Sequence, residues 1–155
     1  MRYQFPSIEE GLINLKKKGC SEIFVVPLYP HYAMSTVLTT EKEVIRIENE
    51  LELDLKLNFI KAFYNEQEYI SSLSNVISNN RQTESDFLLF SYHGIPNRHL
   101  LKTDPTQSHC LKVENCCDME SKAKPFCYKA QVIETSRLCA KQLELKENEW
   151  GISFQ

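Results

Sequence analysis

The stretch DFLLFSYHGIP, residues 86–96, decides the fold. Its first seven residues form an apolar, β-rich run that ends abruptly at His93 and Gly94. The run EIFVVPL, residues 22–28, has the same character, and Pro27 indicates that ladder hydrogen bonding stops there. Short apolar runs of this kind suit strands that are buried on both faces of a parallel sheet.

Helical patterns alternate with these strands along the chain. Ser7 and Glu10 form a capping-box pattern, which predicts a helix start at residue 8. The apolar spacing predicts helices at about 8–18, 40–53, 65–78 and 128–145, and further strands at 55–63 and from 150 onward. This alternation predicts an α/β protein with parallel sheets flanked by helices. The polar stretch 79–85 is the best candidate for a domain boundary.

Length and composition limit the classes of function. The 155 residues are enough for one domain or for pieces of two, and a net charge of -3 without a basic stripe gives no reason to expect a nucleic-acid partner. No apolar run is long enough to span a membrane, and the first ten residues lack the apolar core of a secretory signal. We therefore expect a cytoplasmic protein.

Two histidines follow the two apolar runs. His93 comes directly after the second run, and His31 lies three residues past the first. Ligands of open α/β sheets bind beyond the carboxyl ends of the strands, so both positions are candidate sites. A neutral imidazole can bind Fe(II) and can also accept a proton. The alternative is that each histidine is simply packed in the protein or exposed at its surface.

Several segments resemble ferrochelatases of the bacterial type. They are MRY with Pro6-Ser7, VPLYPHY at 26–32 with Ser35-Thr36, LFSYHGIP at 89–96, and SFQ at 153–155, which is similar to the opening of that family's F-Q-S-R segment. The resemblance implies a chelatase fold of two similar α/β lobes, each with a four-stranded parallel sheet, and a porphyrin cleft between them. Residues 1–82 would then be the end of the first lobe. Residues 83–155 would be the start of the second, with a Cys-rich insertion at about 97–127.

The resemblance also implies an activity. Ferrochelatases insert Fe(II) into protoporphyrin IX to give protohaem, the last step of haem biosynthesis, so porphyrin and ferrous iron are the expected partners. His93 matches the family histidine at the metal-insertion site, where it would take up iron or accept pyrrole protons. Tyr29 matches the segment that lines the porphyrin cleft. His31 stands where glutamine is common, and it is either a waiting position for the metal or a surface imidazole.

The family pattern extends beyond both ends of this chain. The family's first strands would precede Met1, and the acidic residue that faces the catalytic histidine would follow Gln155. We therefore expect the chain to be an incomplete fragment that is inactive by itself. The resemblance is also compatible with peripheral contact with a membrane.

Four cysteines lie close together in the sequence: Cys110, Cys116, Cys117 and Cys127. Thiolates select zinc, Cu(I) or iron–sulfur clusters, and this spacing lacks the paired C-x2-4-C knuckles of structural zinc sites. The adjacent pair suits a cluster with two iron atoms, so we predict a [2Fe–2S] cluster held by all four thiols. A zinc site that recruits His109 and a metal-free group of thiols are the alternatives. Cys20 and Cys139 are predicted to be small apolar fillers.

Two other functions compete with the ferrochelatase interpretation. One is a non-catalytic iron–sulfur or zinc-binding module on a chelatase-like fold. The other is a related chelatase that inserts cobalt or nickel into a tetrapyrrole. The SYHGIP and PLYP segments argue against the second alternative.

Overall fold

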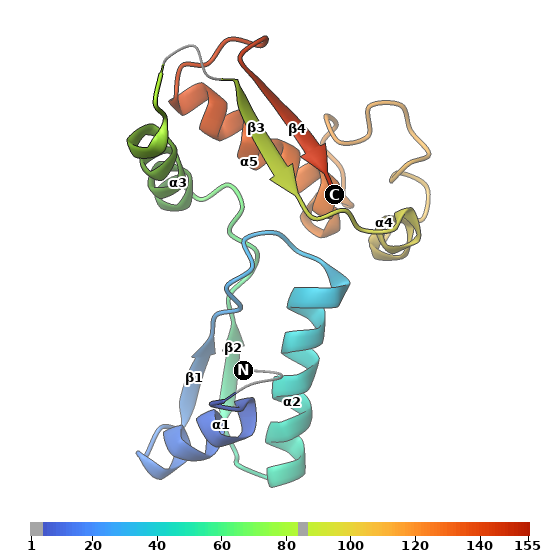
Figure 1. Cartoon of the computed structure of the whole chain (residues 1–155). Helices are drawn as coiled ribbons and strands as arrows, with labels where there is room; N and C mark the ends of the chain where they lie inside the picture. Colours follow the sequence, from blue (N-terminus) through green and yellow to red (C-terminus); the bar gives the residue numbers. More distant parts are fainter. Residues whose placement is uncertain (1–4, 84–86) are drawn as a thin grey trace. The chain divides into compact units, whose positions relative to one another are not determined.

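The computed structural model describes residues 5–83 and 87–155, and the chain divides into two compact units, Met1–Ala62 and Phe63–Gln155 (Figure 1). The predicted lobe boundary at residue 82 concerns the complete protein and stays a prediction. Of the predicted linker at 79–85, residues 84–86 lie outside the described residues, as does the first residue of the run at 86–92.

The first unit is a parallel pair of strands covered by helices. Its elements are α1 (Ile8–Lys17), β1 (Glu22–Val25), the π-helix η1 (Met34–Leu38), α2 (Thr39–Leu51) and β2 (Lys56–Phe59). β1 and β2 pair in register from Glu22 opposite Lys56 to Val25 opposite Phe59. The core of this unit consists of Leu12, Ile23, Val44, Ile47 and Leu55. Val44 and Ile47 lie on the apolar face predicted for residues 40–53, whereas Leu51, predicted on the same face, is exposed.

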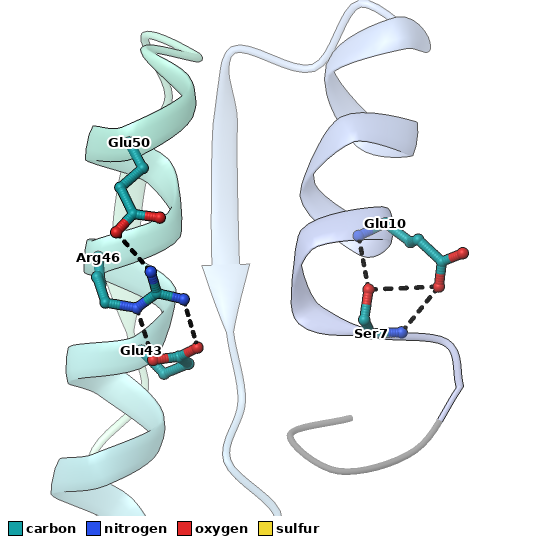
Figure 2. Close-up of polar contacts among 5 residues, drawn as sticks. All are labelled: Ser7, Glu10, Glu43, Arg46 and Glu50. Atoms are coloured by element: carbon teal, nitrogen blue, oxygen red, sulfur yellow. Dashed lines mark hydrogen bonds and ion pairs between the residues drawn. The ribbon is translucent and has the colours of Figure 1, made fainter.

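Local side-chain bonds fix the two helices of the first unit (Figure 2). The Ser7 hydroxyl accepts the amide of Glu10 at 3.0 Å, and the Glu10 carboxylate accepts the amide of Ser7 at 3.0 Å, so the predicted capping box is confirmed. On α2, the guanidinium of Arg46 contacts Glu43 at 2.8 Å and also pairs with Glu50. Water screens these exposed pairs, so they add little to the stability of the fold.

The second unit has the same plan with a longer connection. Its elements are α3 (Gln67–Asn80), β3 (Leu88–Tyr92), α4 (Asn97–Thr103), the short 3-10 helix η2 (Lys124–Phe126), α5 (Tyr128–Gln142) and β4 (Trp150–Phe154). β3 and β4 are parallel, from Leu88 opposite Trp150 to Tyr92 opposite Phe154. Ile70, Phe90 and Cys139 form the core between α3, the strands and α5. Trp150 packs edge-on against Phe90, with ring centroids 5.8 Å apart.

The sequence predicted the four strands and the helices α1, α2, α3 and α5, and the parallel pairing is confirmed. It did not predict η1, η2 or α4; α4 is short and buries only Leu100. One buried residue in two turns leaves no helical period to detect. β1 also ends at Val25, earlier than the predicted end at Leu28, since Pro27 cannot donate a ladder hydrogen bond.

Candidate active site and thiol cluster

His93 stands at the carboxyl end of the β3–β4 pair, and its backbone is fixed on both sides. The amide of Gln155 donates to the carbonyl of Tyr92 at 3.0 Å, and the amide of Gly94 donates to the carbonyl of Gln155 at 2.7 Å. The parallel ladder therefore continues one residue past each strand. The His93 side chain itself is exposed, so a rigid backbone presents an accessible imidazole where ligands bind in open α/β sheets.

Gly94 is required by a close approach of two backbones. A Cβ at this position would lie 3.0 Å from the carbonyl oxygen of Gln155. A larger residue would push the backbone at position 94 away from Gln155. This would weaken the hydrogen bond from the amide of residue 94 to the carbonyl of Gln155. The absence of a side chain at position 94 thus keeps His93 in place.

A cavity of about 260 Å³ opens beside this strand end within the second unit. It is lined by Gly94, Ile95, Asn97, Leu100, Tyr128, Lys129 and Phe154. The walls are mostly apolar, with one amide and one ammonium group among them. Such a lining suits an apolar ligand that carries a polar or anionic edge.

Tyr92, directly before His93, is tied to α5. Its phenol oxygen lies 2.8 Å from the hydroxyl of Ser136, which is itself fully buried. Burial raises the pKa of Tyr92 to about 12, so the phenol is neutral at physiological pH. The sequence analysis missed this pair because the two residues are far apart in the chain and neither belongs to a motif.

Tyr29 and His31 lie in the first unit, in the segment between β1 and the π-helix. Tyr29 is about half exposed, whereas His31 is 9% exposed. Burial lowers the pKa of His31 to about 4, so its imidazole is neutral and able to act as a ligand at neutral pH. The alternative of a surface imidazole at His31 is wrong. The structure places these two residues in one unit, and His93 with the four clustered cysteines in the other.

Three of the four predicted ligand cysteines, Cys110, Cys117 and Cys127, gather in one small core of the second unit. Cys127 is the N-cap of α5, where its sulfur accepts the amide of Ala130 at 3.5 Å. The Cys127 thiol also interacts with the thiols of Cys117 and Cys110, and the Cys117 thiol interacts with that of Cys116. Leu100, Ala123 and Ala130 surround Cys110 and Cys127, which are both buried.

The thiols of this group shift one another's pKa values in opposite directions. The hydrogen bond from Cys117, followed by those from the helix amides and Cys110, lowers the pKa of Cys127 to about 6. The pKa of Cys110 is raised to about 12, first by burial and then by Cys127. Hydrogen bonding to Cys127 and burial likewise raise the pKa of Cys117. Within this group the pKa is lowered at Cys127 and raised at its two neighbours, Cys110 and Cys117.

Asp104, at the end of α4, organises the loop that carries these thiols. Its buried carboxylate accepts the amides of Thr106, His109 and Cys110, each at 2.8 Å, and the Thr106 hydroxyl at 2.7 Å. Burial alone would raise the pKa of Asp104, but these hydrogen bonds outweigh it and hold the pKa well below its usual range. The imidazole Nε2 of His109 lies 2.9 Å from the carbonyl of Cys116, so the ring faces the backbone.

The donor set fits a [2Fe–2S] cluster in kind and number, because three of the four thiols share one core and the fourth, Cys116, interacts with Cys117. As they stand, the thiols interact in a chain that runs from Cys110 through Cys127 and Cys117 to Cys116. Within residues 5–83 and 87–155, no group of three or more His, Cys, Asp or Glu side chains is arranged to hold a metal ion. Ligation would require the paired thiols to turn toward a common centre. Cys139 lies apart from them in the core of the second unit, as predicted for an apolar filler.

Comparison with known proteins gives a consistent result along the whole chain. The family model described as Ferrochelatase matches residues 1–155. The chain is 42% identical to ferrochelatases of Pseudomonas fluorescens and Stutzerimonas stutzeri, covering 100% of this chain and 46% of each relative. It is 39% identical to the ferrochelatase of Coxiella burnetii, covering 43% of that protein. The chain thus spans about half the length of the curated relatives it matches, and it belongs to the ferrochelatase family.

Proposed function

We propose that the protein containing this chain is a ferrochelatase that inserts Fe(II) into protoporphyrin IX, giving protohaem in the last step of haem biosynthesis. The observation that carries the proposal is the family match over residues 1–155 together with the placement of His93. The alternative of a non-catalytic metal-binding module loses support, since the match covers the segment around His93 as well as the cysteine loop.

Metal insertion needs a group that handles both the metal and the pyrrole protons. The porphyrin loses two N–H protons as four nitrogens bind Fe(II). An exposed neutral imidazole can present Fe(II) or accept one of these protons. We assign this role to His93, whose backbone is held by the hydrogen bonds around Gly94 and Gln155.

Tyr29 and His31 are proposed as porphyrin-binding residues. Tyr29 is about half exposed, and an aromatic ring is a surface on which a flat macrocycle can stack. Since His31 is neutral, it adds a nitrogen ligand without adding positive charge that would repel Fe(II). Replacing Tyr29 with leucine should raise KM for the porphyrin more than it lowers kcat.

The test of the activity is His93→Ala in the full-length protein that contains this chain, assayed by insertion of Fe(II) or Zn(II) into a porphyrin. His99→Ala is the matched control, because His99 lies on α4 only six residues further on. We expect His93→Ala to lower kcat roughly a hundredfold or more, and His99→Ala to leave it within about threefold. An unchanged rate of metal insertion in His93→Ala would refute the role assigned to His93.

We also propose that Cys110, Cys116, Cys117 and Cys127 hold a [2Fe–2S] cluster. The gathering of Cys110, Cys117 and Cys127 in one core, with Cys116 beside Cys117, supports this proposal. When bound, the cluster would supply electron-transfer capacity and cross-link the loop. Anaerobic purification should give two iron and two sulfide per chain, and an EPR signal after dithionite reduction, on the order of one spin per cluster. Cys116→Ser should abolish both and Cys20→Ser neither. One zinc without sulfide would identify a structural zinc site instead.

We propose a cytoplasmic location, with porphyrin and ferrous iron as the partners and no nucleic acid. All six cysteines are free thiols, which is usual in a reducing compartment. Within the described parts of the chain, no helix combines the length and apolar character needed to cross a membrane.

A further inference from the structure

We propose that Asp104 is a positioning residue that sets the backbone of the thiol group and thereby holds Cys110 in the core. This inference concerns the proposed cluster site at the four cysteines. That a [2Fe–2S] cluster binds there rests on the proposed function. The role of Asp104 in shaping the loop can be tested with or without a bound cluster.

The Asp104 carboxylate has its acceptor capacity filled by the loop. Oδ1 accepts the amide and the hydroxyl of Thr106, and Oδ2 accepts the amides of His109 and Cys110. Two carboxylate oxygens offer about four lone-pair positions, so the loop uses all of them. Asp104 is only 3% exposed, and the dipoles of these four donors meet its negative charge.

This arrangement reaches two of the cysteines. The amide of Cys110 is bound directly, and its side chain is then 2% exposed. His109, whose amide is bound by the same oxygen, places its ring 2.9 Å from the carbonyl of Cys116. Asp104 therefore holds the backbone of Cys110 directly. It holds the backbone of Cys116 indirectly, through the ring of His109. No apolar side chain could replace it, because the amide of Cys110 would be left buried without an acceptor.

The test compares Asp104→Asn and Asp104→Ala with Asp118→Asn in the full chain. Asp118 is a matched control: it lies in the same loop but is exposed and pairs with Arg137 at 2.6 Å. In reduced, metal-free protein, iodoacetamide labelling of each cysteine and amide hydrogen exchange are followed by mass spectrometry. Losing the acceptor should speed the labelling of Cys110, and exchange at residues 109–110, by about tenfold or more. Asp118→Asn should match wild type.

Cys139 reports on global folding, because it is fully buried in a different core. Faster labelling of Cys110 with unchanged labelling of Cys139 supports the proposal. Equal labelling of Cys110 in wild type and Asp104→Asn overturns it. If the Asp104 variants also expose Cys139, Thr106→Val and Thr106→Ser decide: valine should speed the labelling of Cys110 and serine should restore it, and no difference between them overturns the proposal.

Iron and sulfide analysis of the same variants separates this inference from the cluster. If wild type binds no iron but Cys110 still depends on Asp104, the positioning role stands and the cluster proposal fails. If wild type and Asp104→Asn bind the same cluster with the same EPR spectrum and the same Cys110 labelling, the cluster stands and the positioning role fails.

Discussion

The phenol of Tyr92 donates a hydrogen bond of 2.8 Å to the hydroxyl of Ser136, and that hydroxyl in turn donates to the carbonyl of Val132 at 2.9 Å. The direction follows from the second bond, which uses the only proton of Ser136. The residue before His93 is thereby attached to the middle of α5, while the residue after it is attached to Gln155.

Breaking the Tyr92–Ser136 bond should destabilise the second unit. Tyr92→Phe should lower the free energy of unfolding by about 1 kcal/mol, and Ser136→Ala by about 1–2 kcal/mol, because each variant removes one partner of this hydrogen bond. Urea unfolding of both variants and of the double variant measures the coupling between them. Ser91→Ala, at an exposed position of β3, is the control. Strictly additive effects would contradict the bond.

A side chain at position 94 should be costly. Gly94→Ala puts a Cβ 3.0 Å from the Gln155 carbonyl oxygen. We therefore expect the free energy of unfolding to fall by about 1–3 kcal/mol and the hydrogen bond from the amide of residue 94 to weaken. Gly11→Ala on α1 is the opposite case: nothing lies within 4 Å of its added Cβ. It should stabilise α1 by roughly 0.5–1 kcal/mol. Thermal unfolding of the two variants should therefore shift in opposite directions, and a neutral Gly94→Ala would refute the close approach.

Acid should weaken the fold through His31. Its folded pKa, lowered to about 4 by burial, lies below the ordinary value of 6.5, so the unfolded chain binds the proton more tightly. The contribution of His31 to the free energy of unfolding is fully present above pH 6.5. It is lost as the pH falls toward 4 and below, by up to roughly 3 kcal/mol. Urea unfolding at several pH values should show that His31→Gln lacks this component. A variant with the same pH dependence as wild type would assign it to other groups.

The capping box should contribute measurably to α1. Ser7→Ala removes the acceptor for the Glu10 amide and should cost about 1 kcal/mol. Glu10→Gln retains a carbonyl oxygen that can accept the Ser7 amide, so its cost should be smaller. Circular dichroism during urea unfolding measures both. Equal costs would indicate that the charge of Glu10 near the helix N-terminus, and not the reciprocal bonding, is the main contribution.

The sequence predicted the strands and helices because each leaves a local pattern. The run ending at Tyr92 and the spacing of Val44 and Ile47 are visible without any tertiary information. His93 was predictable for the same reason, since a strand end and a turn locate it. α4 left no such pattern, because the core around it is built from residues distant in sequence.

Tertiary contacts account for what the sequence analysis missed in the site. Asp104 drew no attention as a single carboxylate in a polar loop, and only the folded loop brings the amides of His109 and Cys110 to it. The burial of His31 likewise depends on the packing of its whole segment. The closeness of the four cysteines in the sequence identified them as candidate ligands. It could not show that Cys127 also caps a helix.

The cavity beside His93 has a consequence for how such a protein could evolve. Asn97 and Tyr128 both line it, so the segment of about thirty residues between them starts and finishes at nearly the same place. Chain inserted between two neighbouring points leaves the surrounding sheet in register, and the entropic cost of its length grows only slowly. The cysteine segment can therefore be gained, shortened or lost as a cassette. A lineage could acquire or discard its thiols in one genetic event without rebuilding the strand that carries the histidine.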